Sequence, residues 1–383
     1  MNILYIMRFW PVYGGGETIT VTLANEFVRR KHNVFVVYTY EKVCNPMPYN
    51  VSPNIKSQKM YTIEKFNVTD VKKMHEYIKT HNIDIAINQW GSTKLCHLAV
   101  QNTKCKLITC WHLDILPKVA APHSIKERII KIICGNNIYC KYIHWQQIRS
   151  HDNNYKLSDK YVFLSRSFLE EYIHLSHIKM NTNKLAAISN PLTYNYVYNF
   201  SNYENKCKQV LFVGRIFEYH KRLSYILKIW EQIESDNKFS SWNLCIVGDG
   251  PDMRQTKQLS ADLGLKRVSF EGFKNPQQYY LNSSIFLMTS AFEGFGMTLV
   301  EAQQYGVVPI VMDSYKSLHD IIKNDENGII IPDNDFESFV NELKNLMNDD
   351  KRRRRLAENG SETCKKFSVN TIASAWENLF KTL

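Results

Sequence analysis

The sequence predicts an α/β fold: two facing Rossmann-like domains, each built on a parallel β-sheet covered by helices. Short apolar runs alternate with longer helical patterns through all 383 residues. Such strand–helix–strand repetition gives parallel sheets with helices on both faces. The apolar runs are nearly continuous, as expected for strands buried on both sides. The length also exceeds one ordinary hydrophobic core and suits two domains.

Twelve apolar runs, mostly β-branched or aromatic, are expected to form strands. They cover residues 3–7, 34–40, 83–88, 106–110, 161–164, 186–189, 210–213, 244–247, 268–271, 285–289, 308–311 and 328–331. Helical patterns lie between them, over residues 16–30, 71–81, 166–177, 223–233, 252–264 and 298–305. No run approaches the roughly eighteen apolar residues of a membrane-spanning helix.

The domain boundary is expected within residues 190–208, a polar, turn-rich stretch that begins with Asn-Pro. We expect an N-terminal domain over residues 1–195, a C-terminal domain over residues 205–367 and a closing helix over residues 368–383. Ligands of open parallel sheets bind outside the carboxyl ends of the strands. The expected ligand site is therefore the cleft between the two domains.

Cysteine usage and the first residues indicate a cytoplasmic protein. The nine cysteines are scattered and form no CxxC pair, so neither a zinc site nor a redox pair is predicted, and free thiols indicate a reducing compartment. The first residues contain a short apolar run without a basic leader or a small-residue cleavage site. They are expected to form a strand and not a signal peptide.

The net charge of +11 is concentrated in the first half of the chain. Residues 1–200 carry 25 Lys+Arg and 13 Asp+Glu, whereas residues 201–383 carry 23 and 24. A one-sided basic surface indicates a polyanionic partner: membrane phospholipid, nucleic acid or an anionic glycan.

Two glycine-rich turns follow expected strands. Gly15 and Gly16, in GGGE, open a helix, where backbone N–H groups can approach an anion. A plain tight turn explains them equally well. Gly248 and Gly250, in IVGDGPDM, lack the GxGxxG spacing, so nicotinamide or flavin binding is weakly supported. A turn against a nucleotide and a turn without a ligand both remain open.

Two cations and two carboxylates follow other expected strands of the second half. Arg215 comes directly after a strand, and Lys221 lies six residues further on. Such a pair can hold a diphosphate leaving group, although isolated Arg and Lys are more often solvated surface residues. Glu293 and Glu301 flank the start of a helix and could grip two hydroxyl-bearing parts of one ligand. A first-turn carboxylate with an unrelated surface Glu is the alternative.

These motifs, in this order, resemble glycosyltransferase family 4, a group of retaining enzymes with the GT-B fold. The resemblance covers essentially the whole chain and is strongest over residues 210–332. There GRI…K, VGDGP, the Glu-x7-Glu segment FEGFGMTLVEAQQYGVVPI and ENGIIIP fall at the family's spacing. The resemblance also implies that the closing helix crosses back to brace the N-terminal domain.

The resemblance implies a role for each motif. Arg215 and Lys221 would hold the donor diphosphate, Glu293 the hydroxyls of the transferred sugar, and Glu301 the ribose hydroxyls. Backbone around the glycine turns would cradle the distal phosphate or contact the base. The other residues assigned to donor binding are Gly15, Gly16, Gly248, Gly272, Phe273, Gly296, Met297, Thr298 and Leu299.

His112, in TCWHLD, matches a family histidine that lies over the donor sugar, whereas the residues alone leave a core role equally open. Trp111 and Asp114 are weaker candidates. Asn190 matches a hinge asparagine, but Pro191 replaces the usual glycine and casts doubt on a ligand role for Asn190.

The expected reaction transfers a hexose or N-acetylhexosamine from a UDP-sugar, chosen on family prevalence, to a glycan or lipid-linked glycan in surface polysaccharide synthesis. No carboxylate pair of a retaining glycosidase is evident. Glu293 could be nominated as a nucleophile, but the resemblance argues against it and implies front-face attack, with Arg215 and Lys221 in place of a metal. No DxD motif lies in a plausible donor site, so no metal or other cofactor is expected.

The basic first half is expected to receive the acceptor at the inner face of a membrane. Residues 118–166 carry nine Lys+Arg and three Asp+Glu. Isoleucines at 125, 129, 132 and 133 fall on one helical face, as in a helix lying on an anionic bilayer. An ordinary core-facing helix is the alternative.

Four other functions are compatible with parts of the pattern. A nucleotide-sugar epimerase would share the fold, while a phosphorylase would need a pyridoxal lysine and a longer chain. A basic membrane- or nucleic-acid-binding protein would leave the Glu-x7-Glu segment unexplained, and no nucleic-acid recognition motif is present. A non-catalytic homologue would not need the intact Arg215, Lys221, Glu293 and Glu301.

Overall fold

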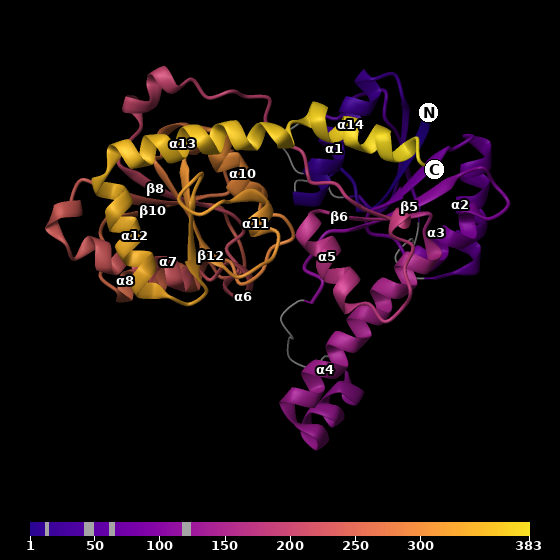
Figure 1. Ribbon diagram of the computed structural model, residues 1–383, viewed down its shortest axis with the longest axis horizontal. Coiled ribbons are helices and arrows are strands. Elements are labelled where there is room, and N and C mark those ends of the chain that lie inside the picture. Colours follow the sequence, from indigo (N-terminus) through magenta and orange to yellow (C-terminus); the bar gives the residue numbers. More distant parts are fainter. Residues whose placement is uncertain (12–14, 42–49, 61–65, 117–123) are drawn as a thin grey trace. The chain divides into compact units, whose positions relative to one another are not determined.

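The computed structural model describes residues 1–11, 15–41, 50–60, 66–116 and 124–383 (Figure 1). These residues form two compact units. Unit 1 consists of Met1–Pro191 and Val369–Leu383, and unit 2 of Leu192–Ser368. The chain therefore leaves unit 1 once, builds unit 2 and returns to unit 1.

Unit 1 is built on a seven-stranded sheet in the order β3-β2-β1-β4-β5-β6-β7, and every described pair is parallel. The interior strand β1 has five consecutive fully buried residues, Ile3 to Met7, because helices cover both faces of the sheet. The strands are β1 (Asn2–Phe9), β2 (Asn33–Tyr40), β3 (Lys56–Lys59), β4 (Ile85–Asn88), β5 (Lys106–Trp111), β6 (Lys160–Phe163) and β7 (Leu185–Ala187).

The helices of unit 1 begin where the sequence supplies capping side chains. Ser92, Ser124 and Ser165 each accept a backbone N–H of the first turn that follows. The helices are α1 (Gly15–Arg29), α2 (Val68–Thr80), α3 (Thr93–Val100), α4 (Ile125–Leu157), α5 (Arg166–Leu175) and α14 (Val369–Phe380). Helix α14 packs along α1, where Arg30 pairs with Glu377 (2.6 Å) and Phe27 contacts Phe380.

Helix α4 is a hairpin and not one straight rod. Gly135 has φ 77° and ψ 170°, which interrupts the helix. The Lys126 ammonium lies 5.5 Å from the ring centre of Tyr142, although 16 residues of continuous helix would span about 24 Å. The chain therefore doubles back at Gly135, and Figure 1 shows this hairpin extending away from the sheet of its unit.

Unit 2 has a six-stranded parallel sheet in the order β10-β9-β8-β11-β12-β13. Its core is formed largely by Ile, Leu and Val of these strands together with Trp230 and Phe339 from flanking helices. The strands are β8 (Gln209–Val213), β9 (Asn243–Val247), β10 (Val268–Gly272), β11 (Ile285–Met288), β12 (Val308–Asp313) and β13 (Ile329–Pro332).

The helices of unit 2 are α6 (Glu218–Lys221), α7 (Leu223–Glu234), α8 (Met253–Asp262), α9 (Gln277–Asn282), α10 (Met297–Gln304), α11 (Leu318–Ile321), α12 (Phe336–Asn348) and α13 (Asp350–Cys364). They connect successive strands of this sheet, except α12 and α13, which follow the last strand. In the part of the chain that the structure describes, no helix of either unit has the length and apolar character needed to cross a bilayer.

The predicted fold class is confirmed, and each of the twelve expected strands forms. One further strand, β3, was not expected. Its sequence is KSQK, and all four residues are exposed at the edge of the sheet. An edge strand of this kind is held by backbone hydrogen bonds to β2 and has no apolar signature in the sequence.

Candidate active site

The loops after β8 and β11 are joined by hydrogen bonds at the carboxyl edge of the unit 2 sheet. The Thr289 hydroxyl donates to the carbonyl of Lys221 (3.0 Å), and the backbone N–H of Ala291 donates to the carbonyl of His220 (2.8 Å). These bonds hold the short helix α6 against the segment that follows β11. As a result, Lys221 and Glu293 meet although 72 residues separate them.

Lys221 and Glu293 form a partly buried ion pair. The Lys221 ammonium contacts Oε1 of Glu293, and the Ser290 hydroxyl donates to the same oxygen at 2.6 Å. Burial by itself would raise the pKa of Glu293. The charges of Lys221 and His220 and these hydrogen bonds outweigh burial, so the pKa lies below its ordinary value. Glu293 is therefore an anion at neutral pH.

His220 lies beside this pair. Its ring stacks on Phe292 with the ring centres 4.4 Å apart, and its Nε2 is 3.9 Å from Oε2 of Glu293. Within the described residues, this buried Nε2 has no hydrogen-bond partner. Burial lowers the pKa of His220.

The other cations of this loop have different surroundings. Arg215 is exposed, and its guanidinium lies 5.5 Å from the ring centre of Phe217. Arg222 is buried, and it donates to the carbonyl of Ser290 (2.8 Å) and to Asp333 (2.6 Å). Arg215 is therefore available to an anionic ligand, whereas Arg222 ties the loop after β11 to the loop after β13.

Glu301 is buried in helix α10, and no cation of the described residues pairs with it. Its carboxylate accepts hydrogen bonds from the hydroxyls of Thr193 (2.9 Å) and Tyr280 (3.1 Å). Burial raises the pKa of Glu301 to about 7, and the two neutral donors only partly oppose this. The two carboxylates of the Glu-x7-Glu segment thus lie in opposite electrostatic surroundings.

Helix α10 begins with an open first turn. Its N-cap, Gly296, has φ 83° and makes no side-chain capping bond. The first N–H groups of a helix have no partner within the helix. Those of Met297 and Thr298 are thus suited to an anionic group, whereas the N–H of Leu299 already donates to the carbonyl of Gly296 (2.9 Å).

The turn after β9 has a structural reason for its glycines. A Cβ on Gly248 would lie 1.8 Å from the carbonyl oxygen of Gly214, and one on Gly250 would lie 2.1 Å from that of Ile216. Neither position can carry a side chain, because the turn packs directly against the turn after β8. Gly272 has φ 72° at the bulged end of β10, and Phe273 next to it is 63% exposed.

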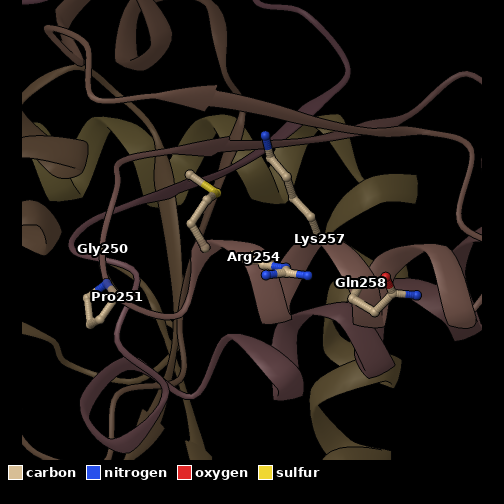
Figure 2. Close-up of a pocket in the computed structure, with 6 residues that line it drawn as sticks. Gly250, Pro251, Arg254, Lys257 and Gln258 are labelled. Carbon is tan, nitrogen blue, oxygen red and sulfur yellow. The ribbon is translucent and has the colours of Figure 1, made fainter.

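A surface hollow lies beside this turn, on helix α8. Figure 2 shows the residues that line it, which are Gly250, Pro251, Met253, Arg254, Lys257 and Gln258. None of the residues that the sequence assigns to donor binding is among them. The hollow adjoins the Gly248 turn without including the Lys221–Glu293 pair.

In unit 1, Gly16, Trp90 and His112 follow the neighbouring strands β1, β4 and β5. The ring of Trp90 stacks on His112 with the ring centres 4.8 Å apart, and a Cβ on Gly16 would come within 3.2 Å of Trp90. Nε2 of His112 is buried and has no hydrogen-bond partner among the described residues. Burial lowers the pKa of His112 to about 4, so its ring is neutral.

The two weaker candidates near His112 have structural contacts. Trp111 packs edge-on against His151 with the ring centres 4.4 Å apart, and its Nε1–H donates to the carbonyl of Asp114 (3.2 Å).

Gly15 begins α1, and a side chain there would meet no atom within 4 Å. Gly14, the first residue of the GGGE motif, lies outside the described residues.

Several residues at these sites escaped the sequence analysis. Trp90, Thr193, Tyr280 and Ser290 lie outside every recognisable motif, and only the fold brings them to His112, Glu301 and Glu293. His220 was open to recognition, since it directly precedes Lys221 in the sequence.

Comparison with known proteins covers both units. Residues 13–192 match Glycosyltransferase Family 4, and residues 199–363 match Glycosyl transferases group 1. An uncharacterized glycosyltransferase of Haemophilus influenzae is 23% identical over 370 residues, which is 96% of each chain. A Campylobacter jejuni enzyme named GalNAc-alpha-(1->4)-GalNAc-alpha-(1->3)-diNAcBac-PP-undecaprenol alpha-1,4-N-acetyl-D-galactosaminyltransferase is 22% identical and covers 96% of this chain and 94% of its own.

Solved structures share the fold over the whole chain. The apo form of the lipopolysaccharide outer core galactosyltransferase WaaB superposes with a TM-score of 0.72 at 19% identity, covering 100% of both chains. Anabaena Alr3699/HepE in complex with UDP and glucose gives a TM-score of 0.75 at 17% identity, also over 100% of both chains. With both halves matched and two parallel-sheet units present, this chain belongs to the glycosyltransferases of family 4 (glycosyl transferases group 1) and has the GT-B fold.

Proposed function

We propose that the protein transfers a hexose or N-acetylhexosamine, with retention of configuration, from a UDP-sugar to a glycan or lipid-linked glycan of a surface polysaccharide. The Lys221–Glu293 pair carries this proposal, because it places a cation for a diphosphate beside a carboxylate for sugar hydroxyls. The names of relatives support it: one transfers N-acetylgalactosamine to an undecaprenol-linked glycan, and one structure holds UDP and glucose.

The donor is proposed to bind along the carboxyl edge of the unit 2 sheet. Arg215 and Lys221 bind the diphosphate, together with the open N–H groups at the start of α10. Glu293 accepts hydrogen bonds from the sugar hydroxyls. Glu301 accepts hydrogen bonds from the ribose hydroxyls, which replace or join those from the hydroxyls of Thr193 and Tyr280. Phe273 and the backbone of Gly272 and Gly248 lie toward the base.

The reaction is proposed to proceed on one face of the sugar. The bond between C1 and the phosphate oxygen breaks as the acceptor hydroxyl oxygen bonds to C1 on the same side. The departing phosphate oxygen takes the hydroxyl proton, which leaves UDP and the extended glycan. Positioning and charge stabilisation then supply the catalysis. Lys221 is central, because its ammonium strengthens its contact with the diphosphate as negative charge develops on the leaving group.

No metal ion is part of this proposal. Among the described residues, no three His, Cys, Asp or Glu side chains come together as a metal site. The cations Arg215 and Lys221 and the N-terminus of α10 are proposed to neutralise the leaving group directly. Gly15, Gly16 and His112 keep their predicted roles at the distal phosphate and over the sugar. The buried, unpartnered Nε2 of His112 supports a role in ligand contact.

The acceptor is proposed to reach the enzyme at an anionic membrane surface through helix α4. At the hairpin, Ile125 is 78% exposed, Ile132 82% and Ile133 76%. The hairpin also carries six Lys+Arg against two Asp+Glu. An isoleucine contributes about 1.5–3 kcal/mol when fully buried in an apolar environment, and each Lys or Arg near an anionic bilayer contributes about 1 kcal/mol.

The deciding experiment measures binding and hydrolysis of a panel of nucleotide sugars in EDTA, with wild type and Glu293→Ala. One donor is expected to bind and turn over slowly without metal in the wild type. The variant is expected to lose the choice among sugars while it still binds UDP, because Glu293 contacts the sugar and not the nucleotide. If the wild type binds neither a nucleotide sugar nor a nucleoside diphosphate, the proposed function is wrong.

A further inference from the structure

The two oxygens of Glu293 have different partners. Oε1 accepts from the Lys221 ammonium and from the Ser290 hydroxyl. Oε2 accepts no hydrogen bond from any residue that the structure describes, and it faces Nε2 of His220 at 3.9 Å. That Nε2 is itself buried and unpartnered within the same residues. Two polar atoms thus face each other at a distance too long for a hydrogen bond.

The His220 ring is held in this orientation. It stacks on Phe292 with an interplanar angle of 20°, and its backbone carbonyl accepts the N–H of Ala291. The backbone of Phe292 favours protonation of the ring, and Nε2 has no hydrogen-bond partner among the described residues. The ring N–H is therefore assigned to the nitrogen other than Nε2. In the neutral ring Nε2 is then an acceptor.

Two facing acceptors need a ligand with two donors. A single hydroxyl can donate to only one of them, and a buried acceptor without a donor costs free energy. Two adjacent hydroxyls of a pyranose present two O–H donors side by side. The side chain of His220 is 27% exposed and its Nε2 is covered, so a ligand hydroxyl bonds to Nε2 by entering the gap between Nε2 and Oε2 of Glu293.

We propose that His220 determines specificity for the transferred sugar: its Nε2 accepts a hydrogen bond from one hydroxyl while Oε2 of Glu293 accepts one from the neighbouring hydroxyl. This inference rests on the proposed function. It deepens that function by naming the substrate class, which is a donor sugar with two adjacent free hydroxyls on the face bound by Glu293.

The test combines protein variants with donor analogues. His220→Phe keeps the flat stacking on Phe292 and removes Nε2. The wild type and this variant are compared on the accepted UDP-sugar and on its deoxy analogues, each lacking one ring hydroxyl. For each protein, kcat/KM for the parent sugar is divided by kcat/KM for each analogue. Comparing these ratios between wild type and variant cancels the intrinsic reactivity of the deoxy sugars.

In the wild type, loss of either of the two adjacent hydroxyls is expected to lower kcat/KM about tenfold, the effect of one hydrogen bond. His220→Phe is expected to lose this discrimination at one hydroxyl and keep it at the neighbour, with UDP affinity unchanged. His220→Gln restores an acceptor and is expected to recover part of the discrimination, which loss of packing alone would not allow. His174→Phe, an exposed histidine in unit 1, is the control.

Two outcomes distinguish a failure of the role of His220 from a failure of the proposed function. If the wild type turns over a UDP-sugar and His220→Phe discriminates among the deoxy analogues as the wild type does, the role of His220 is overturned while the transferase function stands. If the wild type turns over no nucleotide sugar, the proposed function fails and the role of His220 fails with it.

Discussion

Glu293 and Glu301 lie eight residues apart and are both buried, yet their surroundings make them chemically different. Glu293 has Lys221 as a counter-ion, whereas the described partners of Glu301 are the hydroxyls of Thr193 and Tyr280. A buried carboxylate with a cation remains ionised, and one with neutral donors binds a proton more readily. The first therefore presents a fixed charge, and the second titrates close to neutral pH.

The titration of Glu301 has a consequence for stability. Its folded pKa of about 7 exceeds the ordinary value of 4.5, so between these two values the folded protein binds a proton that the unfolded chain does not. The contribution of this group to the free energy of unfolding therefore falls as pH rises from about 4.5 to 7. Relative to wild type, Glu301→Gln is expected to gain stability across this window, by on the order of 3 kcal/mol.

Urea unfolding of both proteins at several pH values between 5 and 8 measures this difference. Glu362→Gln, which removes a carboxylate that is 73% exposed, serves as the control and is expected to show no such gain. A difference between wild type and Glu301→Gln that stays constant with pH would show that Glu301 titrates as an ordinary carboxylate.

At the scale of elements, α4 differs from the other long helices because the isoleucines of its first arm, before Gly135, are exposed, whereas Ile148 and Tyr155 of its second arm are buried with β6. Ile132 and Ile133 lie next to the Gly135 turn and are more exposed than any isoleucine in the core. Basic side chains stack on its aromatic rings, as Arg149 does on Trp145 (5.3 Å). An aromatic and basic hairpin with isoleucines at its turn has the composition of a membrane-surface element.

Replacing Ile132 and Ile133 by Ser is expected to weaken binding to vesicles that contain phosphatidylglycerol by at least tenfold, because two side chains no longer enter the bilayer. The thermal midpoint should stay within a degree or two, since exposed residues contribute little to folding. Sedimentation with vesicles measures the binding. The control is Ile173→Ser on α5, where the side chain is 39% exposed. Equal vesicle binding by wild type and the double variant would rule out the hairpin as the contact.

The sequence predicted the strands and helices more readily than the contacts that these elements make in the fold. Apolar strands such as β1 and β8 are evident because burial on both faces demands continuous apolar residues. The polar edge strand β3 and the reversal at Gly135 carry no such signal. The helical pattern of the isoleucines was visible, but whether they faced a core or a surface depended on a fold-back that only the backbone of Gly135 reveals.

At the candidate site, too, the sequence predicted the motif residues but not the side chains that contact them. Arg215, Lys221, Glu293 and Glu301 belong to motifs with a recognisable spacing, and the structure pairs Lys221 with Glu293. Ser290 and Tyr280 contact the two carboxylates from other loops and helices. Such contacts depend on the order of strands in the sheet, which no local pattern encodes. Gly248 was assigned to donor binding, yet its lack of a side chain is already required by the carbonyl of Gly214.

At the scale of the whole molecule, the two units have separate cores. Trp376 of α14 is buried in unit 1 and Trp242 is buried in unit 2. Trp376→Ala is expected to raise amide hydrogen exchange mainly in unit 1, and Trp242→Ala mainly in unit 2. Removing a buried tryptophan costs about 3–5 kcal/mol. Mass spectrometry of exchanged peptides measures the amide hydrogen exchange of both units, and each variant serves as the control for the other. Equal loss of protection throughout the chain in both variants would show that the units unfold together.

The return of the chain to unit 1 through α14 also sets an order of assembly during synthesis. Helix α14 covers α1 only after the 177 residues of Leu192–Ser368 have been translated. At about 5–20 residues per second this takes roughly 10–35 s. Throughout that interval Phe27 and the Arg30 guanidinium lack their partners on α14, and unit 2 is complete in sequence before α14 is made. The nascent first unit therefore exposes an apolar helix face until the last helix leaves the ribosome, which makes it a natural client for chaperones that bind such surfaces.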